Sequence, residues 1–237
     1  MGKQDAVQET LSIIIPVYNE KKTIQALIEK VRKADVLGLK KEIILVDDGS
    51  QDGTCDILKK INNAKVFFHE QNKGKGAAVR TGLQHARGDI VLIQDADLEY
   101  DPSDYKALLE PLITKKTDVV YGSRFAQSKI FPKNMYYAHC LGNMILTHMT
   151  NMLYSANLSD METCYKVMRK EAVTGLQLNS MRYDIEPELT AKLLKKGFSI
   201  QEVPIQFNPR SFEEGKKINW KDGVVALWTL IKYRFSD

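Results

Sequence analysis

Residues 90–99 read Ile-Val-Leu-Ile-Gln-Asp-Ala-Asp-Leu-Glu, an apolar run followed at once by acidic side chains. Four consecutive aliphatic residues are typical of a strand that is buried on both faces of a parallel sheet. Asp95 and Asp97 then stand at the carboxyl end of that strand, where their oxygens could hold Mg²⁺ or Mn²⁺ together with a diphosphate. An isolated Asp-x-Asp is equally an ordinary solvated turn, so the rest of the chain must decide between these interpretations.

The order strand, polar loop, helix recurs along the first half of the chain. Apolar runs predict strands, and helically spaced apolar residues predict the helices between them. The predicted strands cover residues 11–15, 42–46, 65–68 and 90–93, and the predicted helices cover 22–36, 54–61 and 76–86. This alternation implies an α/β fold, a Rossmann-like central, mostly parallel sheet flanked by helices. Ligands of such sheets bind beyond the carboxyl ends of the strands.

The second half continues with longer helices and further strands. We expect helices at 103–113, 135–154 and 183–196, strands at 118–121, 165–168 and 198–207, and a last helix that begins near Trp220. The helix at 135–154 carries Met144, Ile145 and Met152 on its apolar side. It also brings His139 and Asn143 to one face, where they either hydrogen-bond internally or contact a substrate.

Acidic residues also follow the second predicted strand. Asp47 and Asp48 end the apolar run at 42–46, and two adjacent carboxylates there lose hydration unless a ligand, cation or donor faces them. We expect one of the two to bind a base or a ribose. The following Asp52-Gly53-Thr54 is more typical of a turn and helix cap.

Composition excludes several classes of protein. A formal charge of +4 is compatible with anionic small substrates or a membrane surface, and it predicts no nucleic-acid partner. Three widely spaced cysteines predict neither a disulfide framework nor a zinc site, which favours a reducing cytoplasm. No stretch approaches the length of about 20 apolar residues that a membrane-spanning helix needs, so we expect any membrane contact to be peripheral. Nothing in the sequence predicts an oligomeric state.

Taken together, four motifs resemble family 2 glycosyltransferases, whose fold is called GT-A. They are residues 13–20 (Ile-Ile-Ile-Pro-Val-Tyr-Asn-Glu), 46–50 (Val-Asp-Asp-Gly-Ser), 72–76 (Asn-Lys-Gly-Lys-Gly) and 95–97 (Asp-Ala-Asp). Residues 122–124, 160–166 and 202–205 are similar to the dolichyl-phosphate mannose or glucose synthase branch of that family. The resemblance covers nearly the whole chain.

This resemblance implies a nucleotide site. Its residues would be Pro16, Tyr18 and Glu20 at the base and ribose, joined by Asp47 or Asp48, with Lys75 approaching from its loop and Asp95 and Asp97 holding ribose and metal.

The resemblance also implies a third metal ligand and several phosphate contacts. The position of Glu99 is often Gln in this branch and helps coordinate the ion, and Glu99 adds negative charge there. Arg124, Arg210 and one of Lys216 and Lys217 would meet phosphate groups. Residues 210–217 read Arg-Ser-Phe-Glu-Glu-Gly-Lys-Lys and depart from the usual Arg-x-x-Gly-x-Ser-Lys, so either lysine fits.

By resemblance, the chain is an inverting, metal-dependent hexosyltransferase that uses GDP-mannose or UDP-glucose with Mg²⁺ or Mn²⁺. Its acceptor would be polyprenyl or dolichyl phosphate, which is already ionised and needs no strong base. The alternative acceptor is a saccharide hydroxyl, for which a carboxylate must take the proton, with Asp160 as first candidate and Glu186 as second. The catalytic set is then Asp97, Asp160 and Arg124. A non-enzymatic alternative is a nucleotide-sugar-binding module.

We expect one domain over residues 1–237. It would comprise a leader at 1–10, a nucleotide-sugar-binding half at 11–125, an acceptor-binding half at 126–217 and an amphipathic helix at 218–237. The apolar side of that helix either packs into the core or lies on a membrane, because positive residues flank it. These are Lys221, Lys232 and Arg234. The second alternative would place the protein at the cytoplasmic face of a membrane.

Overall fold

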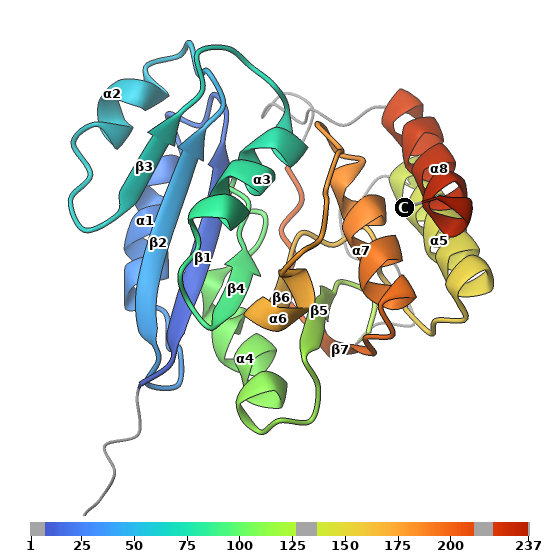
Figure 1. Cartoon of the computed structure of the whole chain (residues 1–237). Coiled ribbons are helices and arrows are strands. Elements are labelled where there is room, and N and C mark those ends of the chain that lie inside the picture. Colours follow the sequence, from blue (N-terminus) through green and yellow to red (C-terminus); the bar gives the residue numbers. More distant parts are fainter. Residues whose placement is uncertain (1–7, 127–136, 211–219, 237) are drawn as a thin grey trace, which may run out of the picture.

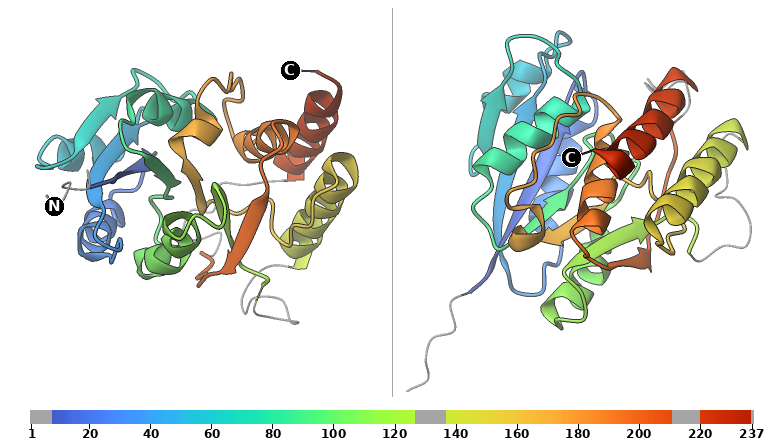
Figure 2. Two further views of the ribbon diagram at one scale, coloured as in Figure 1. Left: turned by 60° about the horizontal axis from the view of Figure 1, so that its bottom comes forward. Right: turned by 45° about the vertical axis from the view of Figure 1, so that its right-hand side comes forward.

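A computed structural model describes residues 8–126, 137–210 and 220–236. Its centre is one seven-stranded sheet, with helices on both faces (Figures 1 and 2). The strands run in the spatial order β3-β2-β1-β4-β6-β5-β7. Their bounds are β1 Thr10–Val17, β2 Lys40–Asp47, β3 Lys65–Phe68, β4 Ile90–Ile93, β5 Val119–Ser123, β6 Lys166–Arg169 and β7 Ile200–Pro204.

The predicted mostly parallel α/β sheet is confirmed. β6 alone among the described strands runs antiparallel to its neighbours β4 and β5, and the other pairs are parallel. The carboxyl ends of β1, β2 and β4 therefore meet at one edge of the sheet, and the residues that follow them form one cluster. β7 is shorter than the predicted strand at 198–207.

The helices divide between the two faces. α1 and α4 cover one face, and α3 and α7 lie over the other (Figure 2). The helix bounds are α1 Ile24–Lys33, α2 Thr54–Leu58, α3 Lys75–His85, α4 Tyr105–Ile113, α5 Tyr137–Tyr154, α6 Lys170–Val173, α7 Ile185–Lys195 and α8 Trp220–Phe235, with a 3₁₀ turn at Pro102–Asp104. The single turn α6 was not predicted, because four residues are too few to show a helical period.

A second, smaller core lies beside the main one. α5 and α8 pack side by side with α7, and Leu146, Met161, Ala226 and Leu230 are buried between them. The hydroxyl of Tyr154 donates to the carbonyl of Leu230 at 2.7 Å and fixes the two helices to each other. None of the described helices is long and apolar enough to cross a bilayer.

The inward faces of α5 and α8 differ from the sequence expectation. Met144, Ile145 and Met152 of α5 and Trp220 and Trp228 of α8 are at least half exposed. α8 instead buries Ala226, Thr229, Leu230 and Tyr233. Helical periodicity identified the apolar stripe of each helix, but the neighbouring helices pack against a different face.

Close packing of α3 against β1 depends on a glycine. Gly82 is buried in α3, and a Cβ at this position would lie 2.3 Å from Cγ2 of Ile14, which is fully buried in β1. A branched side chain in a filled core has no room to move aside.

We therefore expect Gly82→Ala to destabilise the fold by about 1–3 kcal/mol through overpacking, although alanine gains about 1 kcal/mol of helix propensity. Gly142→Ala in α5 is the matched control, because its Cβ would meet nothing within 4 Å. Urea unfolding of both variants measures the difference. A Gly82→Ala protein as stable as the wild type would contradict this account of the α3–β1 contact.

Candidate functional site

Charged side chains from four separate segments gather at the carboxyl edge of the sheet. Glu20 follows β1, Asp47 ends β2, and Asp95 and Asp97 follow β4. Arg210 reaches the same place from the segment after β7. The acidic edge predicted from the sequence is present, and Arg210 brings a basic side chain to it from elsewhere in the chain.

Lys75 neutralises the first carboxylate of the acidic motif. Its Nζ lies 2.7 Å from Oδ1 of Asp95 and 3.1 Å from Oε1 of Glu186. Burial disfavours the charge of Asp95, but the Lys75 ammonium outweighs burial and holds the pKa of that carboxyl below its usual range. Asp95 is therefore ionised at neutral pH, and Lys75 is engaged by carboxylates on two sides.

Arg210 pairs with the second carboxylate of the motif. Its Nη2 donates to Oδ2 of Asp97 at 3.0 Å, and its Nη1 and Nη2 donate to the two oxygens of Glu20 at 3.1 Å each. Its backbone N–H donates to Oε1 of Glu99 at 2.8 Å. Burial, followed by the neighbouring carboxylates of Asp95 and Glu99, raises the pKa of Asp97 to about 7. Negative charge at this point exceeds what the single arginine compensates.

The acidic motif fits a divalent cation that brings its own further ligands. Among the residues that the structure describes, no three Asp, Glu, His or Cys side chains form a ready-made metal cage. Mg²⁺ sites, however, commonly use one or two carboxylates, with waters and substrate phosphates as the remaining ligands. A cation between Asp95 and Asp97 would relieve the repulsion that raises the pKa of Asp97. The ligand role of Glu99 stays a prediction.

The adjacent aspartates after β2 have different surroundings. Asp48 accepts from the backbone N–H groups of Lys73 at 2.9 Å and Gly74 at 2.7 Å, and its Oδ1 lies 2.7 Å from Nδ1 of His69. These bonds hold the loop that leads into α3 and so place Lys75. Asp48 thus organises the loop, a contribution that the adjacency of the two aspartates could not reveal.

Asp47 differs from Asp48 in that one of its carboxylate oxygens has no hydrogen bond to any described residue. Its Oδ2 accepts from the backbone N–H of Ser50 at 3.0 Å and from Sγ of Cys55 at 3.1 Å. Its Oδ1 is buried without a hydrogen bond to any described residue. Pro16 and Tyr18 are half-buried near the end of β1, whose register places Val17 beside Asp47.

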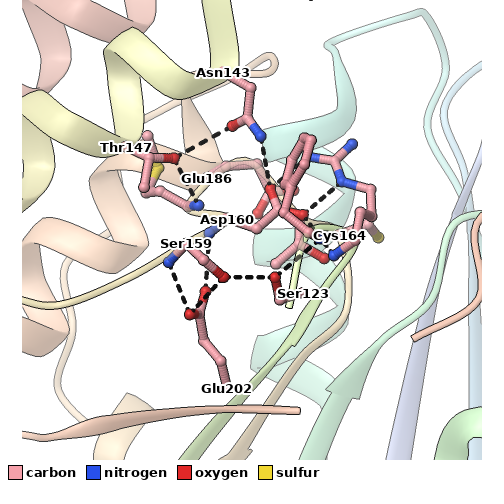
Figure 3. A network of polar contacts seen from close by, with 12 residues as sticks. Ser123, Asn143, Thr147, Ser159, Asp160, Cys164, Glu186 and Glu202 are labelled. Atoms are coloured by element: carbon pink, nitrogen blue, oxygen red, sulfur yellow. Dashed lines mark hydrogen bonds and ion pairs between the residues drawn. The ribbon is translucent and has the colours of Figure 1, made fainter. Parts of the chain in front are cut away.

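Directly after β5, Arg124 forms a bidentate ion pair with Asp160, whose side chain is fully buried, whereas that of Arg124 is 9% exposed. Figure 3 shows Asp160 beside Asn143 and Ser159. Nε and Nη2 of Arg124 donate to the two carboxylate oxygens of Asp160 at 2.6 Å each, and the backbone N–H of Arg124 donates at 3.0 Å. Nδ2 of Asn143 adds a bond at 2.9 Å. These four donors fill both oxygens of Asp160, two on each, so neither oxygen is left open for the hydroxyl of a substrate.

Two residues that received no role from the sequence complete this network. Glu202 of β7 accepts from the backbone N–H and hydroxyl of Ser159 and from the backbone N–H of Asp160, at 2.7–2.9 Å. Lys166 of β6 is fully buried, with its Nζ 2.6 Å from Oε2 of Glu186. The sequence signal for Lys166 was a lysine placed inside a short, apolar strand. Glu186 therefore lies between two ammonium groups.

Glu162 is a third residue to which the sequence assigned no role. Its Oε1 is buried and has no hydrogen bond to the described part of the chain, and burial is the main cause that raises its pKa to about 7.

Lys216 and Lys217 lie outside the described residues, as do residues 1–7 of the predicted leader and the first two residues of the helix predicted at 135–154.

Comparison with known proteins finds relatives over most of this chain. Residues 12–176 match the model of glycosyl transferase family 2. The UDP-N-acetylglucosamine–dolichyl-phosphate N-acetylglucosaminyltransferase of Methanococcus voltae is 34% identical, over 94% of this chain and 96% of that protein. The dolichol-phosphate mannosyltransferase of Pyrococcus furiosus is 30% identical over 87% of this chain, and the match spans 58% of that enzyme.

Solved structures share the fold. Glucosyl-3-phosphoglycerate synthase from Mycobacterium tuberculosis, crystallised with Mn²⁺, uridine diphosphate and glucosyl-3-phosphoglycerate, superposes with a TM-score of 0.73. The superposition covers 97% of this chain and 81% of that chain at 22% identity. The GT-A fold predicted from the sequence is thus confirmed.

Proposed function

The chain belongs to glycosyl transferase family 2, in the dolichyl-phosphate sugar transferase branch, and on that premise we propose that it transfers a hexose from a nucleoside diphosphate sugar to polyprenyl phosphate. The donor would occupy the edge formed by Asp47, Asp95 and Asp97. Relatives whose names carry dolichyl phosphate support this acceptor class.

The Arg124–Asp160 ion pair is the observation that favours a phosphate acceptor. A guanidinium that a carboxylate holds through Nε and Nη2 keeps its remaining N–H groups in a fixed orientation, which suits donation to phosphate oxygens. A hydroxyl acceptor would instead need a free carboxylate as base. Both oxygens of Asp160 are occupied by donors, and the two oxygens of Glu186 are paired with the ammonium groups of Lys75 and Lys166, so neither residue offers a free carboxylate. We therefore propose that Asp160 positions Arg124.

The chemistry is a displacement at the anomeric carbon. An oxygen of the acceptor phosphate forms the new bond to that carbon, the bond from the carbon to the diphosphate breaks, and the nucleoside diphosphate leaves with the electron pair. A bound Mg²⁺ or Mn²⁺ would neutralise the charge that builds on the diphosphate. Lys75 and Arg210, now paired with Asp95 and Asp97, are placed to extend that stabilisation.

The base and sugar of the donor define the finer proposal. Oδ1 of Asp47 can accept an N–H from the edge of either uracil or guanine, so we keep GDP-mannose and UDP-glucose as donors. The Methanococcus relative is named for UDP-N-acetylglucosamine, which adds a third donor to be tested.

Transfer to a lipid-linked acceptor is consistent with the exposed apolar side of α5 and α8. We propose that this side rests on the cytoplasmic surface of a membrane. The described part of α5 has no Asp, Glu, Lys or Arg side chain, and its exposed residues include Leu141, Met144 and Ile145. On α8, Trp228 is 64% exposed between charged helix ends. Such a surface, flanked by basic residues, suits an anionic lipid interface.

Purified protein should label a short polyprenyl phosphate when it is supplied with radiolabelled GDP-mannose, UDP-glucose or UDP-N-acetylglucosamine and Mn²⁺. The unphosphorylated polyprenol should stay unlabelled, because it offers Arg124 no anion. Arg124→Gln should lower kcat/KM for the acceptor by about 100-fold or more through the lost charge–phosphate contact. Donor binding, followed by thermal shift, should change little, and this separates the loss from misfolding. Transfer only to saccharide hydroxyls would refute the proposed acceptor.

The membrane contact can be tested by flotation with vesicles that contain phosphatidylserine or phosphatidylglycerol. Wild-type protein should float with anionic vesicles and less so at high salt, whereas Trp228→Glu should stay unbound. Phe68→Glu is the matched control, because Phe68 is an exposed aromatic residue on β3, away from α5 and α8. Equal flotation of the wild type and Trp228→Glu, or none of either, would contradict the proposal.

A further inference from the structure

Glu162 is a buried carboxyl in the loop that joins Asp160 to β6. Four charged residues influence it electrostatically: Lys166 and Glu186, which pair with each other, and Arg124 and Asp160, which form the second pair. Its Oε1 is buried without a hydrogen bond to the described residues. The hydroxyl of the neighbouring Thr163, which is fully buried, has none either within the same described ranges.

The nearby cations are committed to other carboxylates. Nε and Nη2 of Arg124 donate to Asp160. Lys166 binds Glu186 at 2.6 Å and donates to the backbone carbonyls of Met161 and Thr163. The cations near Glu162 are thus already paired with carboxylates, and those carboxylates disfavour a negative charge on Glu162.

We infer that Glu162 contacts the phosphate of the acceptor as a neutral carboxylic acid and donates a hydrogen bond to it. This inference rests on the proposed polyprenyl phosphate acceptor and assigns a further residue to that site. Burial raises the pKa of Glu162 to about 7, which is consistent with a carboxyl that still carries its proton near neutral pH.

A neutral acid is the form of this side chain that a phosphate tolerates. An ionised phosphate offers only acceptor oxygens, so an ionised Glu162 would repel it, and a protonated Glu162 supplies the donor. Carboxylic acids kept neutral by an apolar site act as hydrogen-bond donors in other enzymes. An anion bound beside Glu162 would raise its pKa further. No proton moves in the transfer step, because the phosphate oxygen that attacks the sugar is already ionised.

The test compares kcat/KM for polyprenyl phosphate from pH 6.5 to 8.5 in the wild type, Glu162→Gln, Glu162→Leu and Glu110→Gln. The free acceptor titrates identically in every reaction, so the ratio of Glu162→Gln to wild type isolates Glu162. This ratio should rise by about 20-fold as Glu162 ionises in the wild type, because the amide stays neutral and still donates. Glu162→Leu, which is neutral but has no donor, should already lose about tenfold at pH 6.5. Glu110→Gln, on the exposed side of α4, should follow the wild type.

Two results would overturn the inference. A parallel pH profile for Glu162→Gln and wild type would show that Glu162 does not meet the phosphate. Loss of kcat in Glu162→Gln at every pH would show that the carboxylate itself takes a proton. Donor-induced thermal shifts confirm that each variant is folded. If the wild type labels no polyprenyl phosphate at all, the proposed function fails instead, so the two failures are distinct.

Discussion

Carboxylates buried at the carboxyl edge of the sheet need cations, and the rest of the site is arranged around this requirement. An uncompensated charge inside a protein costs several kcal/mol, so each buried carboxylate must pair with a basic residue, accept hydrogen bonds from N–H groups or hold its proton. Each partner comes from a distant segment. The pairs are Lys75 with Asp95, Arg210 with Asp97 and Glu20, Arg124 with Asp160, and Lys166 with Glu186. Glu162 has no such partner within the described ranges, and burial raises its pKa to about 7.

The pairs differ in how readily a ligand can exchange with them. Asp160 is fully buried and has four donors, so Arg124 is held in a fixed orientation. Lys75, Asp95, Asp97 and Arg210 keep 15–21% of their side-chain surface accessible. Buried ion pairs seldom add net stability compared with apolar packing. We interpret the Arg124–Asp160 pair as part of the acceptor site. In the accessible pairs, we interpret Lys75 and Arg210 as cations that are available to a bound donor.

Much of the fold and part of the site followed from sequence. Buried apolar strands ending in acidic residues predicted both the sheet and its functional edge, because the strand ends of a parallel sheet coincide. The cation partners carry no comparable signal, since Arg210 and Glu20 are 190 residues apart and a basic residue in a loop resembles any solvated one. The sequence motif identified Asp160 as a candidate site residue, but it did not identify Arg124 as the ion-pair partner of Asp160. For α5 and α8, helical periodicity identified the apolar face of each helix. Which face is buried depends on the neighbouring helices, and the sequence of the helix alone does not show this.

The central claim is that Arg210 holds Asp97 in the absence of donor and exchanges that carboxylate for the diphosphate. Electron paramagnetic resonance of Mn²⁺ titrated into wild type and Arg210→Gln, with and without nucleoside diphosphate, tests it most directly, with Arg87→Gln as a control on an exposed residue. The claim predicts opposite effects. Arg210→Gln should bind Mn²⁺ alone about threefold to tenfold more tightly, since the competing cation is gone, and should bind the Mn²⁺–nucleotide complex less tightly. Weaker binding of both, or no change in either, would contradict the claim.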